Sequence, residues 1–96
     1  MNKTEAAYLI HLQARPDVLD VVYEGCKLKL AEATFYTPDF VVVTPDGIEL
    51  HEVKGFWEDD ARVKWKATAE KFWWFKFVAV QKEKGGWKIE EYGGGR

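Results

Sequence analysis

The chain has little cysteine, little proline and no long hydrophobic run. Its 96 residues include only one cysteine, Cys26. This count excludes an internal disulfide and a multi-cysteine zinc site, and it favours a reducing compartment such as the cytoplasm. No apolar run approaches the roughly 20 residues that cross a bilayer. The polar start Met1-Asn2-Lys3 does not resemble a secretory signal, so we expect no membrane partner.

The remaining composition is typical of one small folded domain. Hydrophobic residues make up 47% and charged residues 31% of the chain, which is an ordinary balance for a globular protein. We expect a single domain over residues 1–92, followed by a disordered glycine-rich tail over 93–96. Aromatic residues are abundant at 16%, with five tryptophans. So many rings predict a dimer surface or a binding face in addition to a core.

The net charge of −2 hides an uneven distribution of charge. Residues 1–60 carry a net charge of −7, and residues 61–96 carry +5. An acidic half is suited to a metal ion and a basic half to an anion. The alternative is a chance fluctuation in solvated surface charge, and the composition alone leaves both interpretations open.

Periodicity and turn residues predict an α/β domain with a central mixed sheet. The first helix is expected from an N-cap at Thr4 to about Gln13, before Pro16. A second helix is expected from Asp59 or Asp60 to about Phe72. Extended segments or strands are expected at residues 17–24, 27–30, 40–44, 48–54, 75–80 and 87–92.

A tight turn, Thr44-Pro45-Asp46-Gly47, joins two of these strands and predicts a hairpin. The favoured connection is a three-residue loop with a bulge at Gly47, which pairs Thr44 with Ile48. That register places Asp39 on the face away from Glu52. A loop of two or four residues, or a bulge near Asp39, puts the two carboxylates on one face.

Side chains alternate along a strand, so Glu52 and Lys54 share a face. If Asp39 joins them, two carboxylates repel each other, and a hard divalent cation such as Mg²⁺ relieves the repulsion. Such an ion can polarise a phosphoryl group, while Lys54 holds water or stabilises developing charge. The alternative is a hairpin with an exposed Glu–Lys pair and a turn-forming Pro-Asp.

The segments Tyr36-Thr37-Pro38-Asp39-Phe40 and Glu52-Val53-Lys54-Gly55 resemble the PD-(D/E)XK nuclease superfamily, which includes type II restriction endonucleases and archaeal Holliday-junction resolvases. Small phage and prophage members are the closer match, with an early helix acid and a Lys-x-Lys helix, here Glu5 and Lys64-Trp65-Lys66. The similarity runs from about Asn2 to Phe72.

This resemblance implies a restriction-endonuclease-like fold, a DNA substrate and the cytoplasm of a bacterial host. It also implies that Asp39, Glu52 and the Val53 carbonyl hold Mg²⁺ or Mn²⁺ and that Lys54 is catalytic. Glu5 matches a helix acid that some members add to the metal site.

Other chemically notable residues have two interpretations each. The basic residues Arg62, Lys64, Lys66 and Lys71 contact phosphates or form a solvated helix face. Trp57, Trp73 and Trp74 stack on splayed bases, or they pack in a core or dimer interface. His11 and His51 lack metal-type spacing and are expected to have structural or surface roles, with His51 facing away from Glu52.

Taken together, these features predict a metal-dependent DNA endonuclease that acts on branched or recombination DNA. The chain has no obvious sequence-reading insertion, which favours selection by DNA structure. We expect a homodimer and no organic cofactor. The alternatives are a catalytically silent nucleic-acid-binding or assembly module of the same fold, and a structural protein whose motif is coincidental.

Overall fold

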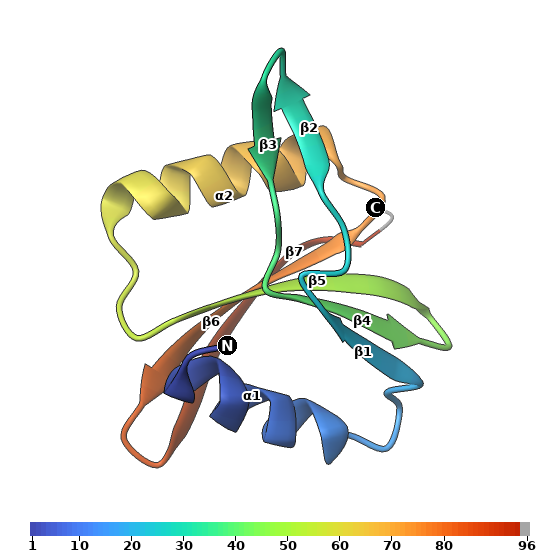
Figure 1. The fold of residues 1–96 in the computed structure, drawn as a ribbon, viewed down its shortest axis with the longest axis vertical. Coiled ribbons are helices and arrows are strands. Elements are labelled where there is room, and N and C mark those ends of the chain that lie inside the picture. Colours follow the sequence, from blue (N-terminus) through green and yellow to red (C-terminus); the bar gives the residue numbers. More distant parts are fainter. Residues whose placement is uncertain (95–96) are drawn as a thin grey trace.

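Two helices lie on opposite faces of one five-stranded sheet in the computed structural model, which describes residues 1–94 (Figure 1). The helices are α1 (Lys3–Gln13) and α2 (Asp59–Lys71). The strands of this sheet are β1 (Asp20–Tyr23), β4 (Phe40–Thr44), β5 (Gly47–Lys54), β6 (Lys76–Glu83) and β7 (Gly86–Gly93). No helix in the described residues is long and apolar enough to cross a membrane.

The sheet is mixed, which confirms the α/β class with a central mixed sheet. Its strand order is β1-β4-β5-β6-β7. Only β5 and β6 run parallel, and α2 makes the crossover between them. The other neighbouring strands pair antiparallel.

A separate two-stranded sheet projects from the body of the molecule (Figure 1). It consists of β2 (Leu28–Ala31) and β3 (Thr34–Tyr36), and we call it the β2–β3 arm. Its inner side chains, Leu28 and Tyr36, pack against the core on the α2 face. The arm includes β3, a strand that the sequence did not predict.

The first helix begins two residues earlier than expected. Its N-cap is Asn2, not Thr4. The Asn2 side chain accepts a hydrogen bond from the backbone N–H of Glu5, and Glu5 accepts one in return from the backbone N–H of Asn2, each at 2.8 Å. This reciprocal capping box satisfies two helix-end donors at once and fixes the position of Glu5.

The β4–β5 hairpin has a different register from the one that its turn residues favour. Thr44 pairs with Gly47, and Phe40 pairs with His51, so the loop has two residues rather than three. Continuing this register by one residue places Asp39 across from Glu52. The three-residue loop that would have separated them is therefore wrong, and the two carboxylates come from the same side of the hairpin.

Strand alternation divides the core between the two helices. On the α1 face, Tyr8 and Leu12 of the helix pack on Phe40, Val42 and neighbouring strand residues. On the α2 face, the helix residues Trp65 and Ala69 are buried with Leu50, Phe77 and Ala79. The buried Phe77 is thus a core residue and offers no surface to a partner.

At the C-terminus, β7 continues to Gly93, the first residue of the expected tail. The backbone N–H of Gly94 donates to the carbonyls of Trp73 and Phe75. Residues 95 and 96 of the expected tail lie outside the described residues.

Candidate active site

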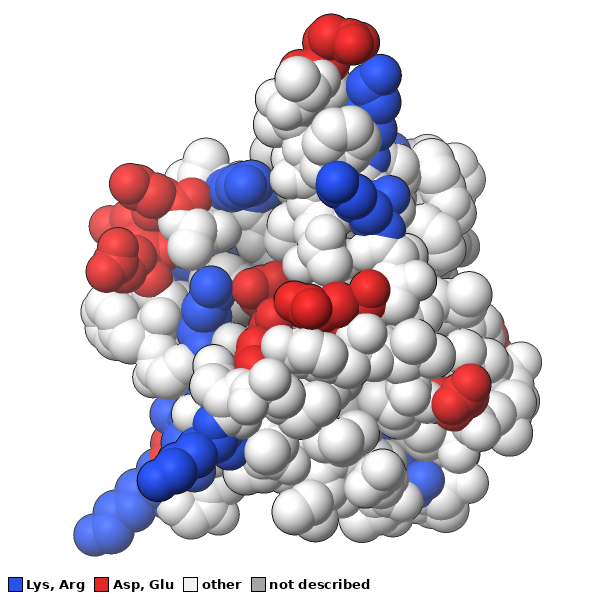
Figure 2. All heavy atoms as spheres, viewed as in Figure 1, with Lys and Arg blue, Asp and Glu red and all other residues white. Residues whose placement is uncertain are grey.

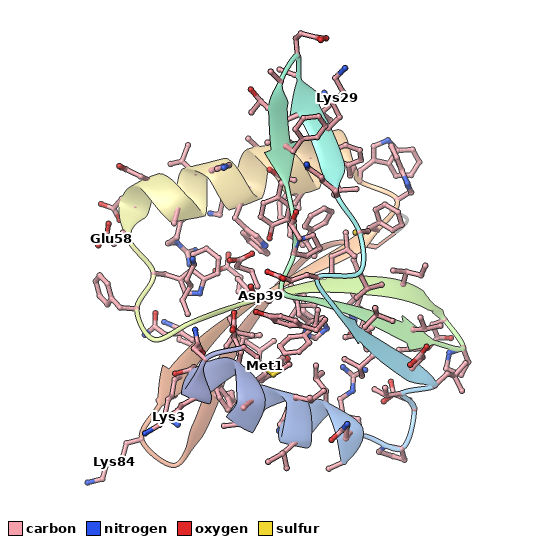
Figure 3. The ribbon with its side chains drawn as sticks, in the orientation of Figure 1. Met1, Lys3, Lys29, Asp39, Glu58 and Lys84 are labelled. Carbon is pink, nitrogen blue, oxygen red and sulfur yellow. The ribbon has the colours of Figure 1, made fainter. Side chains whose placement is uncertain are left out.

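Asp39 lies between the sheet and the β2–β3 arm, at the place where the chain enters β4 (Figure 3). Its carboxylate Oδ2 accepts a hydrogen bond from the backbone N–H of Val53 at 2.8 Å. Its backbone carbonyl accepts one from Glu24 at 2.8 Å. Asp39 is therefore held on both sides, by β5 and by the segment that follows β1.

The Asp39 carboxyl is in an unfavourable place for a negative charge. Burial raises the pKa of Asp39 to about 7; the charges of Glu52 and Glu5 act in the same direction, and the Val53 N–H opposes them. The Asp39 carboxyl also acts to lower the pKa of Glu5, and the Glu5 carboxyl to raise that of Asp39. Glu52 from the hairpin and Glu5 from α1 thus both act on Asp39.

Glu5 is buried at the start of α1 and reaches this group from the α1 side. Its Oε1 accepts hydrogen bonds from the backbone of Asn2 and, at 3.2 Å, from the Tyr23 hydroxyl. Burial acts to raise the pKa of Glu5, but hydrogen bonds from Asn2, Asp39 and Tyr23 outweigh it and lower that pKa. The structure therefore places Glu5 beside Asp39.

Glu52 and Lys54 lie on the α2 face at the end of β5. Glu52 Oε1 accepts a short 2.6 Å hydrogen bond from the Tyr36 hydroxyl, and Glu52 Oε2 lies 3.4 Å from Lys54 Nζ. The Glu52 side chain is largely covered, whereas that of Lys54 is 41% exposed. The Lys54 side chain thus remains partly open to solvent beside its ion pair with Glu52, while Tyr36 of the arm holds Glu52 in place.

The donor set suits a hard divalent cation, although the ligands are not assembled in advance. Within residues 1–94, no three His, Cys, Asp or Glu side chains form a ready-made metal-binding group. Asp39 and Glu52 are instead engaged by Val53, Tyr36 and Lys54. Their chemistry still fits, because Mg²⁺ and Mn²⁺ prefer carboxylate oxygens. Burial, and after it the charges of Glu52 and Glu5, raise the pKa of Asp39, and a cation at this place would offset both effects.

A pocket of about 360 Å³ opens beside Glu52 and Lys54, between the β2–β3 arm and α2. Phe35, Tyr36 and Thr37 line it from the arm, and Lys64 and Trp65 line it from α2. Acidic side chains gather in the middle of this face of the molecule, with basic side chains on the arm above them (Figure 2). The site therefore combines carboxylates, a hollow and positive charge at its rim.

The four basic residues of α2 do not act as one group. Only Lys64 lines the pocket. Arg62 forms a 2.6 Å ion pair with Glu90 of β7, and Lys71 donates to the backbone carbonyl of Leu30 in the arm. Lys66 is exposed on the helix.

His51 faces away from Glu52, as expected, and is buried beneath α1. One ring nitrogen, Nδ1, lies 2.7 Å from the Tyr8 hydroxyl, and the other, Nε2, lies 2.8 Å from Glu49. His11 is exposed and stacks on Tyr8. Neither histidine forms a hydrogen bond with Glu5, Asp39 or Glu52 among the described residues.

Sequence reasoning missed three residues of this region: Tyr23 and Phe35 entirely, and Tyr36 as the partner of Glu52. The available signal was the position of Tyr36 three residues before Asp39. Comparison of the chain with protein-family models, with curated proteins and with solved structures finds no match.

Proposed function

We propose that the protein is a metal-dependent DNA endonuclease that hydrolyses phosphodiester bonds in branched or recombination DNA. The observation that carries this proposal is the two-residue hairpin loop, which sets Asp39 opposite Glu52 with Lys54 on the same face. Asp39 and Glu52 would hold Mg²⁺ or Mn²⁺ together with the Val53 carbonyl, and Glu5 would support Asp39. The bound ion supplies charge neutralisation at the phosphate and lowers the pKa of water.

The side chains of the chain itself have distinct tasks in this proposal. Lys54, which is partly exposed, orients the attacking water and stabilises charge that develops on the phosphate. Tyr36 fixes the orientation of Glu52 through the 2.6 Å hydrogen bond. Lys64 at the rim contacts a neighbouring phosphate.

A homodimer fits a nuclease of this size, because two strands of a duplex require two cuts and each chain carries one motif. Trp73 and Trp74 follow α2 and are 44% and 52% exposed. They contact each other edge to face, with ring centroids 5.8 Å apart. We propose that these two rings lie at the symmetric interface.

The decisive experiment is a titration of Mg²⁺ or Mn²⁺ with branched and linear DNA, read as cleavage and, by calorimetry, as metal binding. Asp39→Ala and Glu52→Ala should each weaken metal binding severely and abolish cleavage. Asp46→Ala is the matched control, because Asp46 is an exposed acid at the turn of the same hairpin. It should bind metal and cut DNA as the wild type does.

Each alternative has its own signature in the same titration. DNA binding without cleavage at any metal concentration would identify a silent binding or assembly module. If the wild type neither bound DNA nor cut it, the motif would be coincidental. Unchanged metal binding in both alanine variants would remove Asp39 and Glu52 from the site.

A further inference from the structure

The pocket between the β2–β3 arm and α2 has the size of a site for one small ligand. Its volume of about 360 Å³ lies near the lower end of small-ligand pockets, which begin at about 300 Å³. It is open on one side and is bordered by Glu52 and Lys54. A group bound here therefore lies directly beside the candidate active site, but the hollow is too small for a duplex.

The arm wall of the pocket is aromatic and held in place. Phe35 is 43% exposed, and its ring lies 4.5 Å from Lys27 Nζ in a cation–π contact. The next residue, Tyr36, is anchored by Glu52. An exposed ring that a neighbouring cation supports is a ready surface for stacking a planar ligand.

The opposite wall adds positive charge and an unused hydrogen-bond donor. Lys54 and Lys64 both line the pocket and are suited to a phosphate. Trp65 lines it too, and its buried indole N–H has no hydrogen-bond partner within residues 1–94. A buried donor without a partner is costly, and a base edge carries the carbonyl and ring-nitrogen acceptors that such a donor takes.

From these walls we infer that the pocket receives one unpaired nucleotide of the DNA substrate, with its base against Phe35 and its phosphate towards Lys54 and Lys64. This inference rests on the proposed nuclease function and specifies its substrate: DNA with at least one base outside the duplex. Stacking on aromatic side chains depends little on the identity of the base. Selection therefore follows from DNA structure, because a paired base within the stack does not reach the pocket.

The test uses two short duplexes that differ only in one unpaired 2-aminopurine, with Ca²⁺ in place of Mg²⁺ so that no cleavage occurs. The wild type should bind the bulged duplex about tenfold more tightly than the paired one and quench the 2-aminopurine fluorescence. Phe35→Ala should lose about tenfold affinity for the bulged duplex and the quenching, but keep its affinity for the paired duplex. Phe35→Trp, which keeps an aromatic ring at this position, should keep both the affinity for the bulged duplex and the quenching.

Phe56→Ala is the matched control, because Phe56 is an exposed phenylalanine that does not line this pocket; it should behave as the wild type. Equal losses on both duplexes, or tight binding without quenching, would overturn the inference. The inference would also be overturned if free deoxyadenosine monophosphate, at the same concentration as the bulged duplex, displaced that duplex from the protein. The pocket would then be a mononucleotide site.

Failure of the inference is distinguishable from failure of the proposed function. If the wild type cuts DNA with Mg²⁺ but binds bulged and paired duplexes equally, the nuclease assignment stands and the nucleotide pocket is wrong. If the wild type neither binds nor cuts any of these DNAs, both are wrong.

Discussion

Glu49 should be the largest single source of acid sensitivity on the α1 face, and Glu49→Gln tests this. The Glu49 carboxylate is buried and accepts hydrogen bonds from Arg15 at 3.0 and 3.3 Å and from His51 at 2.8 Å. The hydrogen bond from His51, assisted by Arg15, lowers the pKa of Glu49 from 4.5 to about 2 against the opposing effect of burial.

This lowered pKa is equivalent to a stability contribution. A carboxylate whose pKa is lower in the folded chain stabilises the fold above its unfolded pKa, and the contribution is lost as the pH falls through the folded pKa. The difference between 4.5 and about 2 corresponds to about 3 kcal/mol. Glutamine keeps one acceptor oxygen but not the charge, so we expect Glu49→Gln to lose about 2 to 3 kcal/mol at pH 7.

The assay is chemical denaturation followed by tryptophan fluorescence between pH 7 and pH 2. The unfolding free energies of wild type and Glu49→Gln should differ at pH 7 and converge between pH 4.5 and 2. Burial also lowers the pKa of His51, whereas Glu49 acts to raise it, so both proteins should lose stability below pH 6.5. Glu83→Gln, at an exposed end of β6, is the control. A difference that stays constant down to pH 2 would refute the reasoning.

Three further predictions concern single groups. Lys54→Ala should keep the fold and the metal affinity but cut DNA much more slowly. Its activation free energy for cleavage should rise by a few kcal/mol, about the effect of removing one preorganised electrostatic group. A wild-type cutting rate would make Lys54 a surface residue without a catalytic role. Tyr8→Phe leaves Nδ1 of His51 without its 2.7 Å partner and should lower the unfolding free energy by about 1 to 3 kcal/mol in denaturant titrations; a loss below about 0.5 kcal/mol would contradict a buried hydrogen bond. Light scattering should give twice 11.1 kDa at micromolar concentration, and Trp73→Ala with Trp74→Ala should return the monomer mass; a wild-type monomer even with DNA would point to a nicking enzyme.

Local patterns predicted most of the helices and strands, because each element carries its own periodicity and turn residues. The second helix begins at Asp59 and ends at Lys71, close to the ends that the acidic cap residues and the apolar stripe predict. The strand β3 was missed because three residues, Thr34 to Tyr36, are too few to show alternation. It exists through pairing with β2 and through packing of Tyr36 on the core, which are tertiary effects.

Two errors at the candidate site have instructive causes. The cap expected at Thr4 lies instead at Asn2, which Glu5 follows three residues later in the capping-box pattern. The hairpin register was misjudged because turn statistics favour a bulge at Gly47, whereas burial of Phe40, Val42 and Val53 on one face fixes the pairing. Both corrections strengthen the site, since they place Glu5 and Glu52 beside Asp39.

The alternation of β5 separates the groups that stabilise the fold from those of the candidate site. Glu49 and His51 face α1, whereas Glu52 and Lys54 face the pocket. Within the described residues, no side-chain hydrogen bond or ion pair joins one pair to the other. Loss of the Glu49 charge should therefore reduce stability without changing metal affinity in the folded protein. If Glu49→Gln weakened metal binding at a pH where the variant is fully folded, the position of β5 would depend on the α1 network, and the two faces would form one coupled unit.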